Sequence, residues 1–106
     1  MNDVLEKRLF KKYSFFKEPF SFEINDEWFR IIDSLAAEIM KIYSDNNMPI
    51  NIVVTQVKEK YNRLCFYYWF DYDIEGYDYD KFHELRISDR IFETVKKAEE
   101  WSSENE

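Results

Sequence analysis

Apolar residues recur along the chain with two different spacings, and these predict where helices and strands lie. Spacings of three and four residues, typical of a helix with one buried face, occur in three segments. Alternation of apolar and polar residues, typical of a strand, occurs in three others. The predicted helices cover residues 4–16, 25–46 and 88–102, and the predicted strands cover residues 20–24, 50–61 and 64–72.

The central helix has the clearest signals at both ends. Asn25 is a favourable N-cap residue, and Ile24 and Phe29 occupy the two hydrophobic-staple positions around it. At the other end Asn46 or Asn47 can take the left-handed cap conformation. The predicted buried stripe consists of Trp28, Ile31, Ile32, Leu35, Ala36, Ile39, Ile42 and Tyr43.

The two outer helices are amphipathic, and each has a distinctive charge pattern. Residues 1–18 form a predicted basic amphipathic helix, whose cations suit a solvated face better than a nucleic-acid or membrane contact. The last helix ends in glutamates that oppose the helix dipole, so residues 103–106 are expected to fray. Its predicted buried residues are Ile91, Val95, Ala98 and Trp101.

The two longer strands are predicted to form an antiparallel hairpin. Its tight turn is Tyr61-Asn62-Arg63, in which Asn62 can adopt a positive φ. Both faces of the hairpin are apolar, so we expect helices on one face and a partial cover on the other. In the first strand the alternation assigns one face to Ile50, Ile52 and Val54 and the other to Val53 and Val57.

These elements predict one α+β domain spanning residues 1–106. An antiparallel hairpin, widened to three strands if residues 20–24 join it, packs against two main helices, with the N-terminal helix over an edge or the far face. Ten Phe, eight Tyr and three Trp are more aromatic side chains than so small a core can hide. Some of these rings are therefore expected at the surface, where Tyr and Trp often anchor contacts.

The net charge of -7 changes the range of expected partners. It disfavours direct binding to nucleic acid or to an anionic membrane, and it suits a protein partner with a basic surface. Solubility alone would explain it equally well. The single cysteine, Cys65, and the absence of a membrane-length apolar run favour the cytoplasm.

Enzymatic chemistry has little support in the sequence. Cys65 lies in an apolar strand, and His83 is the only histidine and has no nucleophile motif beside it. One glycine in the whole chain leaves no phosphate-binding loop. We therefore expect a protein that is not an enzyme and uses no cofactor or metal.

One candidate binding surface is acidic and rich in tyrosine, and we call residues 71–80 the acidic loop. Carboxylates held on a rigid hairpin can imitate phosphates, and tyrosines can fill pockets, so such a surface could occupy the basic groove of a nucleic-acid enzyme. The alternative is a solvated loop that keeps the hairpin from pairing with neighbours. The predicted partner-binding residues are Asp71, Tyr72, Asp73, Glu75, Tyr77, Asp78, Tyr79 and Asp80.

The same loop opens with the spacing of a calcium-binding loop. Asp71, Asp73 and Glu75 stand at the first, third and fifth positions and Gly76 at the sixth. Phe82 stands at the twelfth position, where a bidentate glutamate normally completes the site. Calcium binding is therefore the weakest of the binding hypotheses.

Cations and aromatic rings surround the hairpin turn. This combination suits a nucleotide, through phosphate pairing and base stacking, with Arg30 or Arg86 completing a pocket. Ordinary cross-strand charge pairing explains the same residues. The alternative ligand-binding residues are Lys58, Lys60, Arg63, Tyr67 and Trp69.

The hairpin resembles a group of small, functionally uncharacterised proteins from bacteria and their phages. Their strand reads V-K-E-K-[FY]-G-x-L-R-[FY]-Y, after a tryptophan-bearing helix and before a helix with an alanine-glutamate pair. Asn62 replaces the turn glycine, Cys65 replaces a basic residue, and the cysteine-rich tail of many members is absent. The matching residues are Trp28, Ile31, Ile32, Gln56, Val57, Lys58, Glu59, Lys60, Tyr61, Leu64, Phe66, Tyr67, Ala98, Glu99 and Ser102.

The resemblance implies a phage or prophage accessory protein and implies no activity. Combined with small size, acidity and spare aromatic rings, it suggests an anti-defence inhibitor that binds a host protein through the acidic loop. A toxin-immunity protein is a close variant, and a protein that sequesters a nucleotide signal is the alternative of another class. A homodimer is compatible with a hairpin whose two faces are apolar.

Overall fold

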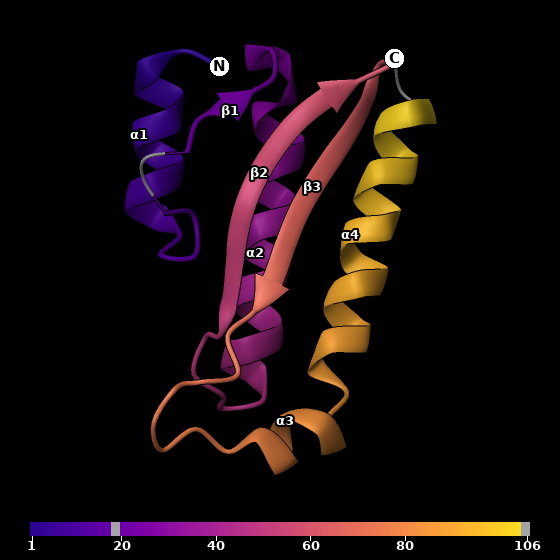
Figure 1. The fold of residues 1–106 in the computed structure, drawn as a ribbon. Coiled ribbons are helices and arrows are strands. Elements are labelled where there is room, and N and C mark those ends of the chain that lie inside the picture. The colour runs from indigo at the N-terminus through magenta and orange to yellow at the C-terminus, as the bar shows by residue number, and fades with distance from the viewer. Residues whose placement is uncertain (18–19, 105–106) are drawn as a thin grey trace.

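The computed structural model describes residues 1–17 and 20–104, and it confirms the α+β class. A three-stranded sheet lies against two long helices, with a third helix beside the first strand (Figure 1). No helix in these described residues is long and apolar enough to cross a membrane. The elements in chain order are α1 (Asp3–Lys12), β1 (Phe22–Glu23), the 3₁₀ turn η1 (Asp26–Trp28), α2 (Phe29–Asp45), β2 (Ile52–Lys60), β3 (Arg63–Phe70), α3 (Tyr79–Glu84) and α4 (Ile87–Glu104).

The first helix is shorter than predicted. It ends at Lys12, and a turn at Ser14 and Phe15 follows. This turn brings the chain beside β2, where Phe16 bridges to Val54 and the Phe15 carbonyl accepts a hydrogen bond from the Val54 N–H. Tyr13, Phe15 and Phe16 are buried, although they follow the end of the helix. Residue 18, the last of the predicted helical segment, lies outside the described residues.

The sheet has β2 at its centre, with β1 parallel and β3 antiparallel to it. The predicted third strand is therefore present, but only Phe22 and Glu23 belong to it. A β-bulge at Thr55 shifts the register, since Val54 pairs with Tyr68 whereas Gln56 pairs with Tyr67. The prediction for Val57 was therefore wrong: the extra residue turns it to the buried face, where it is fully covered.

The turn between β2 and β3 is as tight as predicted. Asn62 has φ 62°, and Tyr61 has φ 52°, so both central residues take the left-handed conformation of a primed turn. The long central helix is also confirmed, although η1 precedes it and the Asn25 side chain makes no capping hydrogen bond. Asn47, with φ 56°, takes the predicted left-handed cap.

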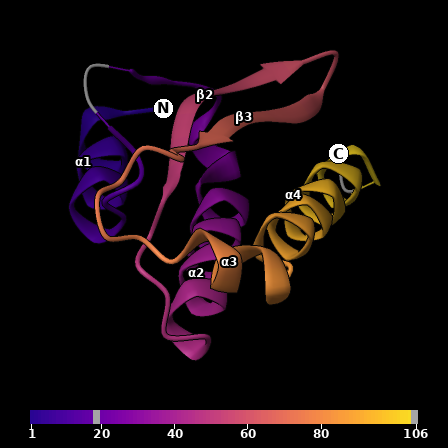
Figure 2. The same ribbon diagram turned by 60° about the horizontal axis from the view of Figure 1, so that its bottom comes forward.

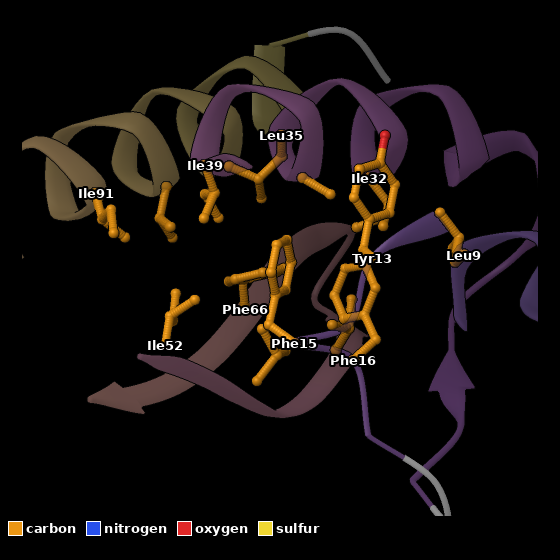
Figure 3. Packing of buried hydrophobic residues seen from close by; sticks show 14 of the residues in the cluster. Leu9, Tyr13, Phe15, Phe16, Ile32, Leu35, Ile39, Ile52, Phe66 and Ile91 are labelled. Atoms are coloured by element: carbon orange, nitrogen blue, oxygen red, sulfur yellow. The ribbon is translucent and has the colours of Figure 1, made fainter. Parts of the chain in front are cut away.

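The core lies between the sheet and the pair α2–α4. Figure 2 shows both helices on one side of the hairpin, and Figure 3 shows side chains of these helices pointing toward Ile52 and Phe66 of the sheet. Along α4, Ile91 and Val95 are buried as predicted, whereas Trp101 is 54% exposed, contrary to its predicted burial. The helix continues to Glu104, so residues 103 and 104 of the predicted frayed tail are helical, and residues 105–106 lie outside the described residues.

Candidate functional site

The acidic loop begins where β3 ends, and backbone contacts fix its start. The Asp71 N–H donates to the Asn51 carbonyl at 2.8 Å, which continues the β2–β3 ladder by one pair. The Asp71 carboxylate in turn accepts a hydrogen bond from the Asp73 N–H at 2.9 Å, a local turn that aspartate favours. The first three residues of the loop are therefore held in one conformation.

Two of the loop tyrosines hold the loop in place. The Tyr77 hydroxyl donates to the Pro49 carbonyl at 2.8 Å, and burial raises the pKa of Tyr77 to about 12. The Tyr79 hydroxyl donates to the Asp71 carbonyl at 3.2 Å and accepts from the Ile74 N–H at 2.7 Å. These two hydroxyls therefore serve the loop's own structure.

Tyr72 has a different position from the other two tyrosines. Its ring is 49% exposed and stacks on His83 with ring centroids 6.2 Å apart. Both rings also contact Phe82, which is fully buried at the base of the loop. Tyr72 is thus the loop tyrosine whose ring is available for a contact.

The carboxylates of the loop face solvent. Asp73, Glu75 and Asp80 are exposed, and Asp78 caps α3 by accepting a hydrogen bond from the Lys81 N–H at 2.9 Å. Within residues 1–17 and 20–104, the ion pairs are Lys12–Asp33 and Arg86–Asp89, and neither involves the loop. The arrangement is a fixed set of negative charges whose attraction for a basic surface is not neutralised internally.

The calcium-like spacing does not gather its carboxylates. Gly76 has the positive φ, 77°, that such a loop requires at this position. Nowhere in the described part of the chain, however, do three carboxylate, histidine or cysteine side chains come together at one point. Asp71 uses one oxygen for the Asp73 N–H instead.

The alternative ligand-binding residues all lie on one face of the sheet. In β3, Tyr67 and Trp69 point away from the helices and are 45% and 50% exposed. The ladder pairs Lys58 with Cys65 and Lys60 with Arg63, which places these side chains on the same side. We call the outward surface of Lys58, Lys60, Arg63, Tyr67 and Trp69 the hairpin face.

Lysines and aromatic rings on this surface are already in contact. The Lys58 Nζ lies 5.6 Å from the centre of the Tyr67 ring, and the Lys60 Nζ lies 5.7 Å from the Tyr61 ring. The neighbouring Cys65 thiol raises the pKa of Tyr67. The hairpin face therefore combines positive charge with exposed aromatic rings.

The two arginines expected to complete a nucleotide pocket are elsewhere. Arg30 belongs to α2, on the helical side of the sheet, and lines a hollow there with Glu59 and Asn62. Arg86, just before α4, forms an ion pair with Asp89 in the first turn of that helix, at 3.0 Å. The hairpin face is thus an open surface with neither arginine beside it.

Sequence reasoning missed a groove between α2 and α4. It holds about 500 Å³, and Ile31, Leu35, Ala98 and Trp101 supply its apolar lining. The only signal in the sequence was the width of the apolar stripe on the central helix, which extends to Ile31 beyond the buried positions. Trp101 lines this groove and is 54% exposed instead of entering the core.

Cys65 and His83, the residues considered for nucleophilic chemistry, are far apart in the fold. Cys65 is partly exposed near the turn end of β3, whereas His83 is exposed on α3 at the opposite end of the hairpin (Figure 1). Neither lies in a groove described above. The structure therefore does not join them into one site.

The motif behind the family resemblance connects the hairpin to the last helix. The Glu99 carboxylate accepts a hydrogen bond from the Phe66 N–H at 3.0 Å, and the Ser102 hydroxyl accepts one from the Leu64 N–H at 3.1 Å. These motif residues thus have a structural role in this chain. A scan against protein-family models, a search of curated proteins and a search of solved structures all found no match for the chain.

Proposed function

We propose that this protein is a non-catalytic inhibitor that binds a host protein with a basic surface through the acidic loop. One observation carries the proposal: the loop presents exposed carboxylates without ion pairs in the described residues, on a backbone held in place by hydrogen bonds. These hydrogen bonds lie within the loop and join it to Pro49 and Asn51, just before β2. A rigid surface loses little conformational entropy on binding, which favours affinity. A nuclease or another nucleic-acid-handling protein offers the complementary positive charge.

The contact surface in this proposal is narrower than the whole loop. Asp73, Glu75 and Asp80 supply charge, and Tyr72 supplies an exposed ring beside His83. Tyr77 and Tyr79 support the loop from inside. A toxin-immunity protein would use the same surface, against the active site of its cognate toxin, and a phage anti-defence protein would use it against a host factor.

Charge reversal at the loop tests the proposal. Asp73→Lys combined with Glu75→Lys reverses two exposed charges. Neither side chain makes a hydrogen bond within the described residues, so the fold should be kept. Wild type and this variant are each recovered gently from a bacterial lysate and compared by native mass spectrometry. We expect wild type to carry a bound host protein. The variant should bind the same protein with an affinity at least about tenfold lower.

Matched charge reversals on α4 provide the control. Glu93→Lys with Glu100→Lys changes net charge by the same amount at exposed positions outside the loop. A partner that stays with this control and leaves the loop variant supports the proposal. Equal binding by all three proteins would exclude the acidic loop as the contact site.

A nucleotide-binding role for the hairpin face is the second candidate, because the register brings all five of its residues to one side of the sheet. Stacking on Trp69 and pairing with Lys58 and Arg63 would hold the ligand. Titration with common cyclic and linear nucleotides should then quench Trp69 fluorescence, and Trp69→Phe should abolish that signal. An unchanged spectrum throughout the titration would count against this role.

A further inference from the structure

The outer side of the hairpin is an uncovered sheet surface. Helices α2 and α4 occupy the other side, and no helix among residues 1–17 and 20–104 lies over the outer side of the hairpin (Figure 2). Tyr67 and Trp69 on this outer side are 45% and 50% exposed. Val53, which pairs with Trp69, and the partly exposed Cys65 extend this surface along both strands. Two neighbouring rings about half exposed on an open sheet are typical of a contact surface.

Opposite charges stand at the two ends of this surface. The turn end carries Lys58, Lys60 and Arg63, which we call the basic turn, and the acidic loop begins at the other end, directly beyond Phe70 (Figure 1). Neither group takes part in an ion pair among the residues that the structure describes. The aromatic centre thus has a positive end and a negative end.

The edge of β3 is closed to further strand pairing near the turn. The backbone N–H groups of Leu64 and Phe66, which point away from β2 in the plane of the sheet, already donate to Ser102 and Glu99 of α4. Another chain cannot pair with this part of the edge without displacing α4 side chains. A partner of the hairpin must therefore approach its face.

We infer that the partner on this face is a second copy of the chain, packed antiparallel across a two-fold axis near Tyr67. Tyr67 lies four residues from Arg63 and four from Asp71, so rotation about it brings the basic turn of each copy to the acidic loop of the other. The same rotation sets Cys65 of one copy opposite Trp69 of the other. The three cations of each basic turn then lie against the acidic loop of the other copy, and the exposed rings are covered.

The order of charges favours a second copy over other occupants. A polyanion would be attracted to the basic turn and repelled by the acidic loop, and a purely basic partner would meet the reverse. Only a surface with both signs in the opposite order complements the whole face. The face itself, turned by a two-fold rotation, has that order, as an isologous interface requires.

The inference goes beyond the proposed inhibitor role, although both use the acidic loop. In the dimer each loop lies against the basic turn of the second copy, so a basic host partner would compete with dimerisation. Binding of that partner should then shift the protein toward monomers.

Sedimentation equilibrium of wild type and two charge variants tests the dimer. The turn variant, Lys60→Glu with Arg63→Glu, places two carboxylates in the basic turn, and the loop variant, Asp73→Lys with Glu75→Lys, places two lysines in the acidic loop. We expect wild type to be dimeric at concentrations of about 100 μM, whereas each variant alone should dissociate at least about tenfold more readily. A control, Glu93→Lys with Glu100→Lys on α4, should remain dimeric.

Mixing the two variants gives the sharper result. In an antiparallel pair of one turn variant and one loop variant, the introduced glutamates face the introduced lysines, and the other charge contact is that of wild type. The mixture should therefore form a heterodimer, although each component alone dimerises more weakly. Native mass spectrometry distinguishes this heterodimer by its mass. Wild type that stays monomeric at these concentrations, or a mixture that forms no heterodimer, would overturn the inference.

Failure of the dimer and failure of the inhibitor proposal give different results. The turn variant keeps the acidic loop intact, so it should still capture a basic host partner even though it no longer dimerises. Monomeric wild type that captures such a partner would exclude only the dimer. A wild-type dimer whose captured proteins are unaffected by the loop variant would exclude only the inhibitor role.

Discussion

At the residue scale, the polar contact with the clearest energetic consequence joins α1 to α2. The Tyr13 hydroxyl donates to the Asp33 carboxylate at 2.5 Å, and the Lys12 Nζ lies 3.0 Å from the same oxygen. Burial alone would raise the pKa of Asp33, but these two hydrogen bonds lower it below its ordinary value. The contact therefore stabilises the folded chain when Asp33 is ionised.

Replacing Tyr13 with phenylalanine should lower the free energy of unfolding by about 1 kcal/mol at neutral pH, since Asp33 loses its hydroxyl donor. The folded-state pKa of Asp33 is depressed, so this stabilisation is present above the unfolded pKa and disappears as pH falls through the folded value. Urea unfolding at pH about 7 and about 3 measures the difference. Tyr72→Phe is the control, and equal stability of the two variants at neutral pH would contradict the prediction.

Tyr77 should make stability sensitive to alkaline pH. Its folded pKa is raised by burial from 10.0 to about 12, so its contribution is complete below pH 10 and is lost as pH rises toward 12. Tyr77→Phe removes the hydrogen bond to the Pro49 carbonyl and should cost about 1 kcal/mol at neutral pH. The difference in the free energy of unfolding between variant and wild type should then become smaller above pH 10.

Denaturant unfolding from neutral pH to about pH 12 measures that difference, with the exposed Tyr61→Phe as the control. If this difference in the free energy of unfolding stays constant over the range, Tyr77 is not a source of the loss of stability at alkaline pH.

At the scale of elements, the hairpin turn is tight but contains a residue poorly suited to it. Tyr61 has φ 52° and is 88% exposed, so its side chain gains little from packing while its backbone takes a conformation unfavourable for a non-glycine residue. The sequence predicted the positive φ of Asn62 because asparagine tolerates it. The strain at Tyr61 has no counterpart in the hydrophobic pattern.

The double variant Tyr61→Asn with Asn62→Gly should raise the free energy of unfolding by about 1 kcal/mol, because Asn-Gly is the preferred pair for this turn. Thermal and urea unfolding measure the change. Tyr61→Val is the opposite control, since a β-branched residue is less tolerant of positive φ and should destabilise. A double variant no more stable than wild type would mean that the turn is not strained.

The bulge explains why one strand was harder to predict than the other. In β3 the alternation is unbroken, so the sequence correctly places Tyr67 and Trp69 on one face of the strand, although both faces are apolar and the sequence does not say which one faces outward. In β2 the extra residue, Thr55, reverses the alternation halfway along, and no composition signal marks it. Helix existence was predictable from periodicity, whereas the early end of α1 follows from the turn at residues 14 and 15 and the contact of residues 15 and 16 with β2.

At the scale of the whole molecule, charge is divided between the two ends of the hairpin. Sequence reasoning identified both the acidic loop and the hairpin face, since each is a local cluster in the chain. It could not predict that Tyr77 and Tyr79 hold the loop from within, because their partners are the Pro49 and Asp71 carbonyls and not side chains with a pattern. It also missed the groove between α2 and α4, which depends on how two distant helices pack.

If the chain dimerises as inferred, its melting temperature should depend on protein concentration. Mass action stabilises a folded dimer, so a hundredfold increase in concentration should raise the melting temperature by several degrees, and added salt should weaken the effect. Differential scanning calorimetry at several concentrations measures it. The turn variant should melt at one temperature throughout, and concentration independence of the wild type would contradict the prediction.

The three tryptophans happen to sample three different environments of this fold. Trp28 is 7% exposed in the core, Trp69 stands on the hairpin face, and Trp101 stands at the α2–α4 groove. Iodide or acrylamide quenching of single-tryptophan variants would therefore report separately on unfolding, on occupation of the sheet and on occupation of the groove. The chain thus contains intrinsic optical probes that can tell which surface a ligand covers, without any added label.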